Sequence, residues 1–298
     1  MATKNAINSE DPVEVAAGGT GAATLTDHGV LVGSGTGAVT ALAVGTTGQL
    51  LVAATGADPA FSSSAEADFT FGGAESGSSR RLTLENTSNT AGSNAVLSIT
   101  TAGGSAGDPK IVYTIDGVQS FVTGIDNSDS DSYKLSVGTA LGTTDVFIAT
   151  QAGEITMPLT PAFLAVDASA TNVTGDGTNY TLSFATEIFD QNSDWNGSTT
   201  FTAPVTGRFQ FDIAIRISGL TTSHTEGHIE LVTSNRTYLG GYADVGACMD
   251  VNTRYSQNFT VLADMDATDT ATVVLDVSNG TKVVDVDEQS YFSGYLAC

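Results

Sequence analysis

Apolar and polar residues alternate along most of the chain, and this two-residue period is typical of β-strands with one buried face. Between residues 80 and 151 the pattern recurs in short segments, bounded by clusters of Gly, Ser, Asn and Asp that favour turns. The strands predicted in this way are residues 80–86, 95–101, 109–117, 120–126, 132–138 and 145–151. A sustained helical period is absent from the sequence, which therefore predicts an all-β protein.

The longest alternation follows a Pro/Gly turn near residue 205 and predicts a strand with a sharply divided character. Its apolar positions are Phe209, Phe211, Ile213, Ile215 and Ile217, with Arg208, Gln210, Asp212 and Arg216 on the other face. Further along, residues 270–287 contain the pair Asn279-Gly280 between two apolar runs. Because Asn-Gly is a strong signal for a tight turn, this segment is predicted to be a β-hairpin.

Composition divides the chain into three regions. Residues 1–65 are rich in Gly, Ala and Thr, and a flexible linker is an alternative interpretation of them. Residues 66–158 hold the short predicted strands, and residues 159–298 hold most of the aromatic residues. Pro158 and Pro161 mark the boundary between the second and third regions.

The predicted strands of residues 66–158 offer only one or two large apolar side chains per face, and no helix is predicted to cover them. Such a sheet buries too little apolar area to offset the entropy lost on ordering it. Three copies around a common axis would bury these faces against one another and cover the strand edges. The sequence therefore predicts a homotrimer with an elongated β-rich shaft.

The net charge of the chain disfavours some classes of binding partner. The 298 residues include 33 acidic and 10 basic side chains, a net charge of −23, which disfavours binding to nucleic acid. No apolar run reaches the length of a membrane span, and the N-terminus lacks the apolar stretch of a signal peptide, so membrane insertion is not expected. The two cysteines, Cys248 and Cys298, could be free or bridged.

The third region carries a specific motif, which consists of Phe184, Asp190, Trp195, Phe201, Gly207, Phe209 and Phe211. It resembles the signature of the globular head shared by complement component one q and the tumour necrosis factor superfamily, although Phe209 stands where tyrosine is usual. The last residues, YFSGYLAC, are similar to the closing strand of that family. The resemblance implies a jelly-roll head over residues 159–298, which forms trimers through an aromatic and aliphatic face.

The earlier regions resemble another class of protein. Residues 18–52 are similar to a Gly-rich element of bacteriophage tail-fibre proteins, and residues 82–101 resemble fibre shaft segments. The resemblance implies a virion fibre made in the bacterial cytoplasm, with residues 1–65 anchoring it to other virion proteins. Its head would attach to a glycan or protein of the host surface. The alternative is a capsid-decorating fibre or a spacer without a dedicated receptor.

Candidate chemistry is sparse. Asp126, Asp129 and Asp131 lie within six residues, and carboxylates at alternate positions can bind Ca²⁺. Because the glycine and the closing glutamate of a calcium loop are missing, a solvated turn is the main interpretation and no cofactor is expected. No catalytic constellation of nucleophile, base and orienting residue is recognisable, so the chain is predicted not to be an enzyme.

Receptor contacts are expected in the longest polar stretches of the head, residues 218–228 and 239–255. The candidates there are His224, Glu226, His228, Tyr242 and Tyr255. Aromatic rings can stack on sugars, but contacts within the core or between subunits are the favoured interpretation of the same aromatic residues, and of Trp195 above all.

Overall fold

The computed structural model describes residues 81–298 and, before them, residues 29–63 apart from Thr55, with isolated positions between 13 and 27. Two compact units are present, residues 1–95 and residues 96–298. Residues 64–80 and most of the first 28 residues, which include much of the predicted anchoring region, lie outside the described part. Within that part, no residues form a helix with the length and hydrophobicity that a transmembrane span needs.

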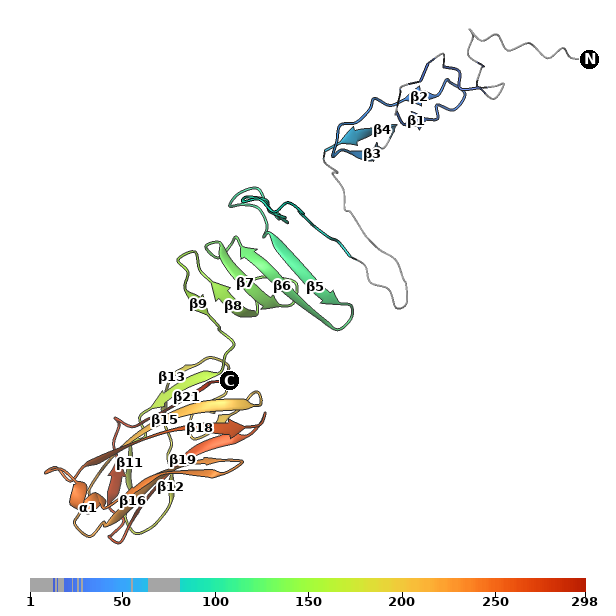
Figure 1. The fold of residues 1–298 in the computed structure, drawn as a ribbon. Helices are drawn as coiled ribbons and strands as arrows, with labels where there is room; N and C mark the ends of the chain where they lie inside the picture. Colours follow the sequence, from blue (N-terminus) through green and yellow to red (C-terminus); the bar gives the residue numbers. More distant parts are fainter. Residues whose placement is uncertain are drawn as a thin grey trace, which may run out of the picture. The chain divides into compact units, whose positions relative to one another are not determined.

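The first unit contains two short antiparallel hairpins (Figure 1). They are formed by β1 (Leu31–Val32) with β2 (Thr40–Ala41), and by β3 (Leu50–Ala54) with β4 (Ala57–Ser62). Gly45 lies against the ring of Phe61, and a Cβ atom at this glycine would come within 2.6 Å of that ring. The Gly-rich segment thus forms ordered hairpins over residues 29–63, where glycine allows close approach of the backbone to a side chain.

A five-stranded antiparallel sheet begins the second unit, and its strands pair in chain order. The strands are β5 (Lys110–Ile115), β6 (Gln119–Asp126), β7 (Ser132–Val137), β8 (Asp145–Ala149) and β9 (Ile155–Thr156). Four of the predicted strands are therefore confirmed, because β5 to β8 fall within residues 109–151. We call this five-stranded sheet the shaft sheet.

Two of the predicted strands are wrong. The predicted segments are 80–86, of which residue 80 lies outside the described part, and 95–101, and the described residues of both form no strand. The alternation of apolar side chains at Leu82, Leu84, Leu97 and Ile99 gives these segments the propensity of strands. A strand also needs a hydrogen-bonded neighbour, and no segment of the described chain supplies one.

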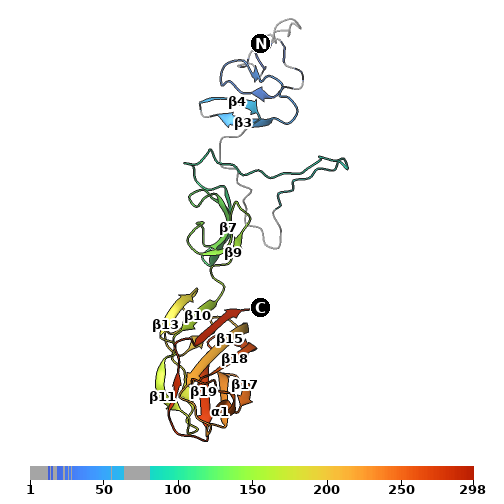
Figure 2. The ribbon, with the colours of Figure 1, turned by 90° about the vertical axis from the view of Figure 1, so that its left-hand side faces the viewer.

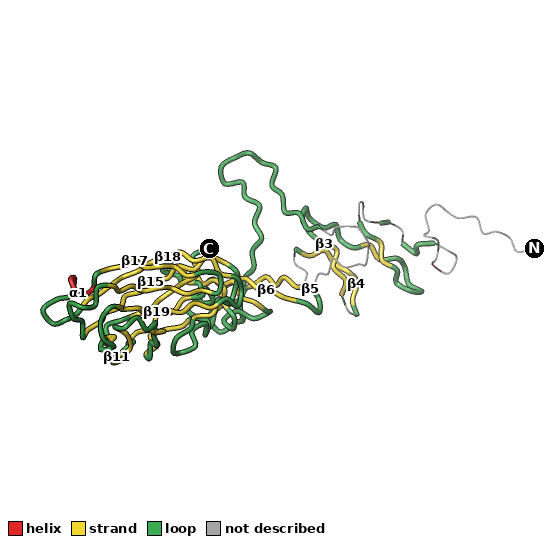
Figure 3. Tube along the Cα trace, turned by 90° about the horizontal axis from the view of Figure 1, so that it is seen from below, coloured by secondary structure: helices red, strands yellow, loops and turns green. Residues whose placement is uncertain are grey.

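The head, residues 162–298, consists of two antiparallel sheets (Figure 1; Figure 2). Its remaining elements are β10 (Ala162–Val166), β11 (Ala170–Thr174), β12 (Tyr180–Thr181), β13 (Thr186–Asp190), β14 (Phe201–Thr202), β15 (Gly207–Ser218), β16 (Glu226–Thr233), β17 (Thr237–Ala243), α1 (Val245–Cys248), β18 (Tyr255–Met265), β19 (Thr270–Ser278), β20 (Val284–Val286) and β21 (Tyr291–Leu296). Among the described residues, α1 is the one α-helix, a single turn that Figure 3 shows in red.

The strand order is that of a jelly roll. One sheet contains β11, β20, β15, β21, β10 and β13 in that order, and β18 pairs with the other edge of β15. The second sheet contains β12, β19, β16 and β17, and β14 also pairs with β19. The central strands β10, β21, β15 and β18 thus face β14, β19, β16 and β17, the two four-stranded sheets of a jelly roll. The predicted class and head fold are confirmed at this level.

The predicted hairpin at residues 270–287 is wrong, although its turn is present. Asn279 has a φ of +71°, as expected for a tight turn. The strands on either side of it, β19 and β20, nevertheless belong to different sheets of the head. The Gly280 amide donates to the Gly175 carbonyl, so the turn carries the chain from one sheet to the other. A turn signal predicts a reversal of direction and does not determine which strands pair.

The hydrophobic core of the head lies between its two sheets and is rich in aromatic rings. Phe163 is in its centre, with ring centroids of Trp195, Phe201 and Phe292 at 5.2, 5.0 and 5.0 Å. Gly294 makes room for this packing, because a Cβ atom there would lie 2.6 Å from the Phe211 ring. All five apolar positions predicted for β15 are at most 3% exposed.

Candidate functional site

The two faces of the shaft sheet differ. One face is apolar and exposed, and the other carries the buried polar side chains and is covered by the chain itself. The strand register places one set of side chains on a common face: Ile111, Tyr113, Ile115, Phe121, Ile125, Tyr133, Leu135, Val137, Phe147 and Ile155. Tyr113, Ile115 and Ile155 are 57%, 67% and 62% exposed. Beside Tyr133 and Phe147 the face is hollowed by about 560 Å³. We call this surface the apolar shaft face.

The opposite face of the shaft sheet is covered by the chain itself. Leu141, in the loop between β7 and β8, is buried there, and Val122 is fully buried beneath. These two residues are the buried hydrophobic side chains of the described part of residues 66–158. The prediction that this region forms only a small apolar interior is therefore confirmed.

Lys134 lies buried on this covered face, surrounded by carboxylates. Its ammonium nitrogen is 2.8 Å from an oxygen of Asp126, 2.6 Å from one of Asp129 and 3.2 Å from one of Asp145. Hydrogen bonding from Lys134 lowers the pKa of the Asp126 carboxyl. Burial alone would lower the pKa of Lys134, but the hydrogen bonds to these aspartates raise it above its ordinary value.

This cluster changes the interpretation of the predicted metal site. The ammonium of Lys134 occupies the place between Asp126 and Asp129 that a cation would take, while Asp131 accepts a hydrogen bond from Gln151. Within the described ranges, no three His, Cys, Asp or Glu side chains are arranged to hold a metal ion. The grouping of Asp126, Asp129 and Asp131 as a calcium site is therefore corrected: the counter-charge is a lysine.

The predicted receptor residues fall into two groups. His224 is fully buried, and we correct its assignment as a contact residue. Its Nδ1 accepts from the Thr221 amide at 2.9 Å, and its Nε2 lies 3.0 Å from the Thr281 carbonyl, to which it donates. His224 thus joins two loops of the head. Tyr255 is also partly buried and packs against the core.

His228 and Tyr242 are brought together on the outer face of the second sheet. They are register partners on β16 and β17, and their ring centroids are 4.4 Å apart. Tyr242 is 60% exposed, and Glu230 lies 3.5 Å from His228 Nε2. Glu226 is two residues before His228, at the start of β16. Glu230 is not among the predicted residues, although its two-residue spacing from His228 already predicts the same face of a strand.

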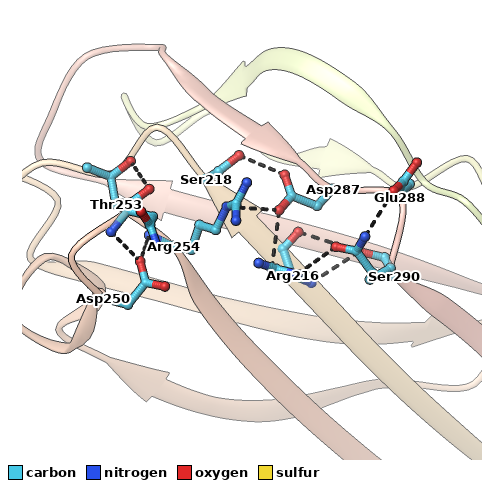
Figure 4. A network of polar contacts seen from close by, with 10 residues as sticks. Arg216, Ser218, Asp250, Thr253, Arg254, Asp287, Glu288 and Ser290 are labelled. Atoms are coloured by element: carbon cyan, nitrogen blue, oxygen red, sulfur yellow. Dashed lines mark hydrogen bonds and ion pairs between the residues drawn. The ribbon is translucent and has the colours of Figure 1, made fainter.

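A network of polar contacts lies at the end of β15, on the outer face of the first sheet (Figure 4). Asp287 accepts a hydrogen bond from Ser218 at 2.7 Å, and its other oxygen lies 3.3 Å from Arg216 and 3.7 Å from Arg254. Asp250 caps the preceding turn through the Arg254 amide at 2.9 Å. The network joins segments far apart in the sequence, so no local motif predicts it.

A second apolar hollow, of about 610 Å³, lies on the outer face of the first head sheet. Leu164, Phe189, Tyr291 and Tyr295 line it, and strand register places them on one side of β13, β10 and β21. Phe189 and Tyr295 are close to half exposed. We call this surface the head groove. The sequence motif gave no signal for it, because its residues point away from the core.

The motif residues Phe184, Trp195, Phe201, Phe209 and Phe211 are core residues, each at most 5% exposed. Asp190 holds the turn before Trp195, and its carboxylate accepts from the amides of Asp194 and Trp195 at 3.1 and 2.9 Å. Desolvation, together with the charge of Asp190, raises the pKa of Asp194 to about 6. Cys248 and Cys298 are both exposed and unbridged.

No model of a known protein family matches the sequence, and no curated protein does so either. Among solved structures, the chain is similar to the globular domain of zebrafish complement 1qA protein, at 13% identity and a TM-score of 0.33, over 47% of this chain and 98% of that one. It is also similar to murine APRIL, at 8% identity and a TM-score of 0.33, over 46% of this chain and 98% of that one.

We expect Lys134→Met to lower the free energy of unfolding of the shaft sheet by about 3 kcal/mol at pH 7, because Asp126 and Asp145 lose their counter-charge. The lowered pKa of Asp126 stabilises the fold above its ordinary value of 3.8 and ceases to do so as the pH falls through the folded-state value. The difference between variant and native should therefore shrink at pH 3. Hydrogen exchange of the β7 amides measures it.

The matched control for this experiment is Lys110→Met. The Lys110 side chain is hydrogen-bonded at 3.3 Å to the Thr139 carbonyl, and Lys110 is exposed. An equal loss of protection in both variants would show that the carboxylates do not depend on a buried ammonium.

Asp194→Asn should stabilise the head at neutral and alkaline pH. A carboxyl whose folded pKa is raised to about 6 favours the fold at low pH and loses that contribution as the pH rises through 6. The variant should therefore have a higher melting temperature than the native chain at pH 8 and the same one at pH 4. A pH-independent difference would exclude ionisation of Asp194 as its cause.

Proposed function

We propose that this protein is the subunit of a homotrimeric virion fibre, which presents the jelly-roll head for attachment to a host-surface glycan. The observation that carries the proposal is the apolar shaft face. An extended sheet with its apolar side chains in water is unfavourable, and a surface of this kind marks a site of association. In the described chain the side chains of this face stay largely exposed, as Tyr113, Ile115 and Ile155 show.

A further copy of the chain is the partner whose chemistry fits. The strand residues of the apolar shaft face carry no charge, and the same apolar pattern continues over five strands. The head groove supplies a second apolar surface, with Leu164 and Phe189 beside two tyrosines. Burial of both surfaces between symmetry-related copies would add the hydrophobic interior that the shaft sheet lacks.

The assignment to a bacteriophage virion is supported by the resemblance of residues 18–52 and 82–101 to fibre proteins. Attachment is supported by the outer face of the second head sheet. Tyr242 presents an exposed ring there, with His228 and Glu230 beside it as hydrogen-bonding groups. An aromatic ring next to polar groups suits a sugar, which has apolar faces and hydroxyl edges. Three such sites in one trimer would raise a weak affinity through multivalency.

The full chain is expected to have three times its chain mass of 30.3 kDa in solution, measured by light scattering. A triple variant, Tyr113→Ser, Phe121→Ser and Ile155→Ser, should shift the mass toward that of one copy, because it removes apolar area from the shaft face. The matched control, Val205→Ser with Val251→Ser, changes exposed apolar residues of the head and should leave the mass unchanged. A native chain with the mass of one copy would refute the proposal.

Attachment is tested by binding of the labelled full chain to a panel of neutral and acidic polysaccharides from bacterial surfaces. We expect a neutral polysaccharide to bind, since the chain is strongly acidic, and Tyr242→Ala to weaken the binding at least about tenfold. Val251→Ala is the control on an exposed loop. A trimer that binds none of the panel would favour the alternative, a fibre that acts as a spacer or decorates the capsid.

A further inference from the structure

The segment before the shaft sheet has the sequence pattern of a β-strand, but in the described chain no strand pairs with it. Residues 96–101 (VLSITT) alternate apolar and polar positions and are rich in β-branched residues, which favour strands. Val96 and Leu97 are 69% and 60% exposed, and Ile99 is 43% exposed. In the described chain no strand pairs with these residues. They therefore present apolar side chains to solvent, together with backbone groups that pair with no strand, although the Thr101 carbonyl accepts from the Gly103 amide.

The first strand of the shaft sheet, β5, has one edge that pairs with no described strand. β5 pairs with β6 along one edge, in register from Lys110 with Gly124 to Ile115 with Gln119. No described segment pairs with its other edge, so the backbone N–H and C=O groups that point to that edge, from alternate residues of this six-residue strand, are unpaired. An open edge of this length normally needs a charge, a proline or a cover to prevent association. Lys110, at the start of β5, is its one charged residue.

The residues that join the segment 96–101 to β5 are hydrogen-bonded elsewhere, and the segment does not pair with β5 of its own chain. Asn127, just after β6, donates from its amide group to the carbonyl of Ala106 at 2.8 Å. Its backbone amide donates to the Asp108 carboxylate at 3.1 Å. These bonds hold residues 106–108 against the turn that follows β6. Residues 96–101 consequently leave the sheet at its end.

We propose that residues 96–101 of one copy add as a strand to the open edge of β5 in a neighbouring copy. The segment and the edge have the same length of six residues, and neither brings a negative charge into a chain whose net charge is −23. Strand addition would supply main-chain hydrogen bonds to both partners. It would also place Leu97 and Ile99, or Val96, beside the apolar shaft face. The inference rests on the proposed self-assembly and specifies how neighbouring copies are joined.

A photo-crosslinker tests this contact directly. Two full-length chains with different purification tags are co-expressed, and only one carries Leu97→benzoylphenylalanine. Mixed assemblies are purified through both tags and irradiated. We expect a covalent pair on a denaturing gel, and mass spectrometry should map the link to residues 110–115 of the unmodified chain. The same crosslinker in place of Val251, which is 99% exposed in the head, should give no pair at β5.

A proline variant provides a second measurement. Ser98→Pro removes a backbone donor from the middle of the added strand and should abolish the crosslink, whereas Ala102→Pro lies beyond the segment and should not. Assemblies of three copies whose crosslinks map only within one chain, or away from β5, would overturn this inference and leave the fibre intact. A native chain with the mass of one copy would overturn the fibre itself.

Discussion

A large apolar core forms within a single copy of the described chain where two sheets face each other. The head meets this condition, and its core is built on the contacts of Phe163 with Trp195, Phe201 and Phe292. The shaft sheet does not meet it, because a single sheet has two faces and a short loop can cover only one of them. Most other features of the described chain follow from this difference, including its exposed aromatic side chains and its unpaired edge.

The chain covers the more polar face of the shaft sheet and leaves the more apolar face exposed. The covered face is held by Lys134 and its three aspartates, with Val122 and Leu141 as the apolar contribution. Removal of one partner of such a buried cluster is costly, even where the intact cluster adds little net stability. The larger apolar area is left on the other side. A sheet that is stable in isolation would be expected to cover its larger apolar face and expose its polar face. The observed sheet exposes the apolar face, which suits association.

Sequence analysis succeeded where local pattern and tertiary partner agree. The alternation from Phe209 to Ile217 predicts β15 because the same face meets the core, and the alternation of residues 109–151 predicts β5 to β8. It failed where the partner decides the outcome. Residues 95–101 have the pattern of a strand but no neighbouring strand among the described residues, and the Asn279-Gly280 turn joins strands of different sheets. Which strands pair with each other depends on residues far apart in the sequence, and neither the hydrophobic period nor a turn signal predicts it.

The candidate residues show the same division. His224 and His228 stand four residues apart, yet the first is buried between loops and the second lies on an outer face. The reason is that His224 precedes β16 and turns inward to bond Thr221 and Thr281, whereas His228 lies within the strand, where alternation determines its face. Sequence period could therefore place His228 and Glu230 together, but not His224, and it could not anticipate that Lys134 would serve as the cation for Asp126.

Symmetry decides what kind of assembly these surfaces can build. A contact between residues 96–101 of one copy and β5 of the next joins two different surfaces, so each copy has one donor and one acceptor. Such a contact either closes into a ring or continues without limit as a filament. In the proposed fibre the head groove would be a second contact between copies, and a closed ring would let every copy make both contacts around a common axis. The small residues and glycines of the chain are consistent with this requirement, because copies that exchange strands must approach closely along their backbones.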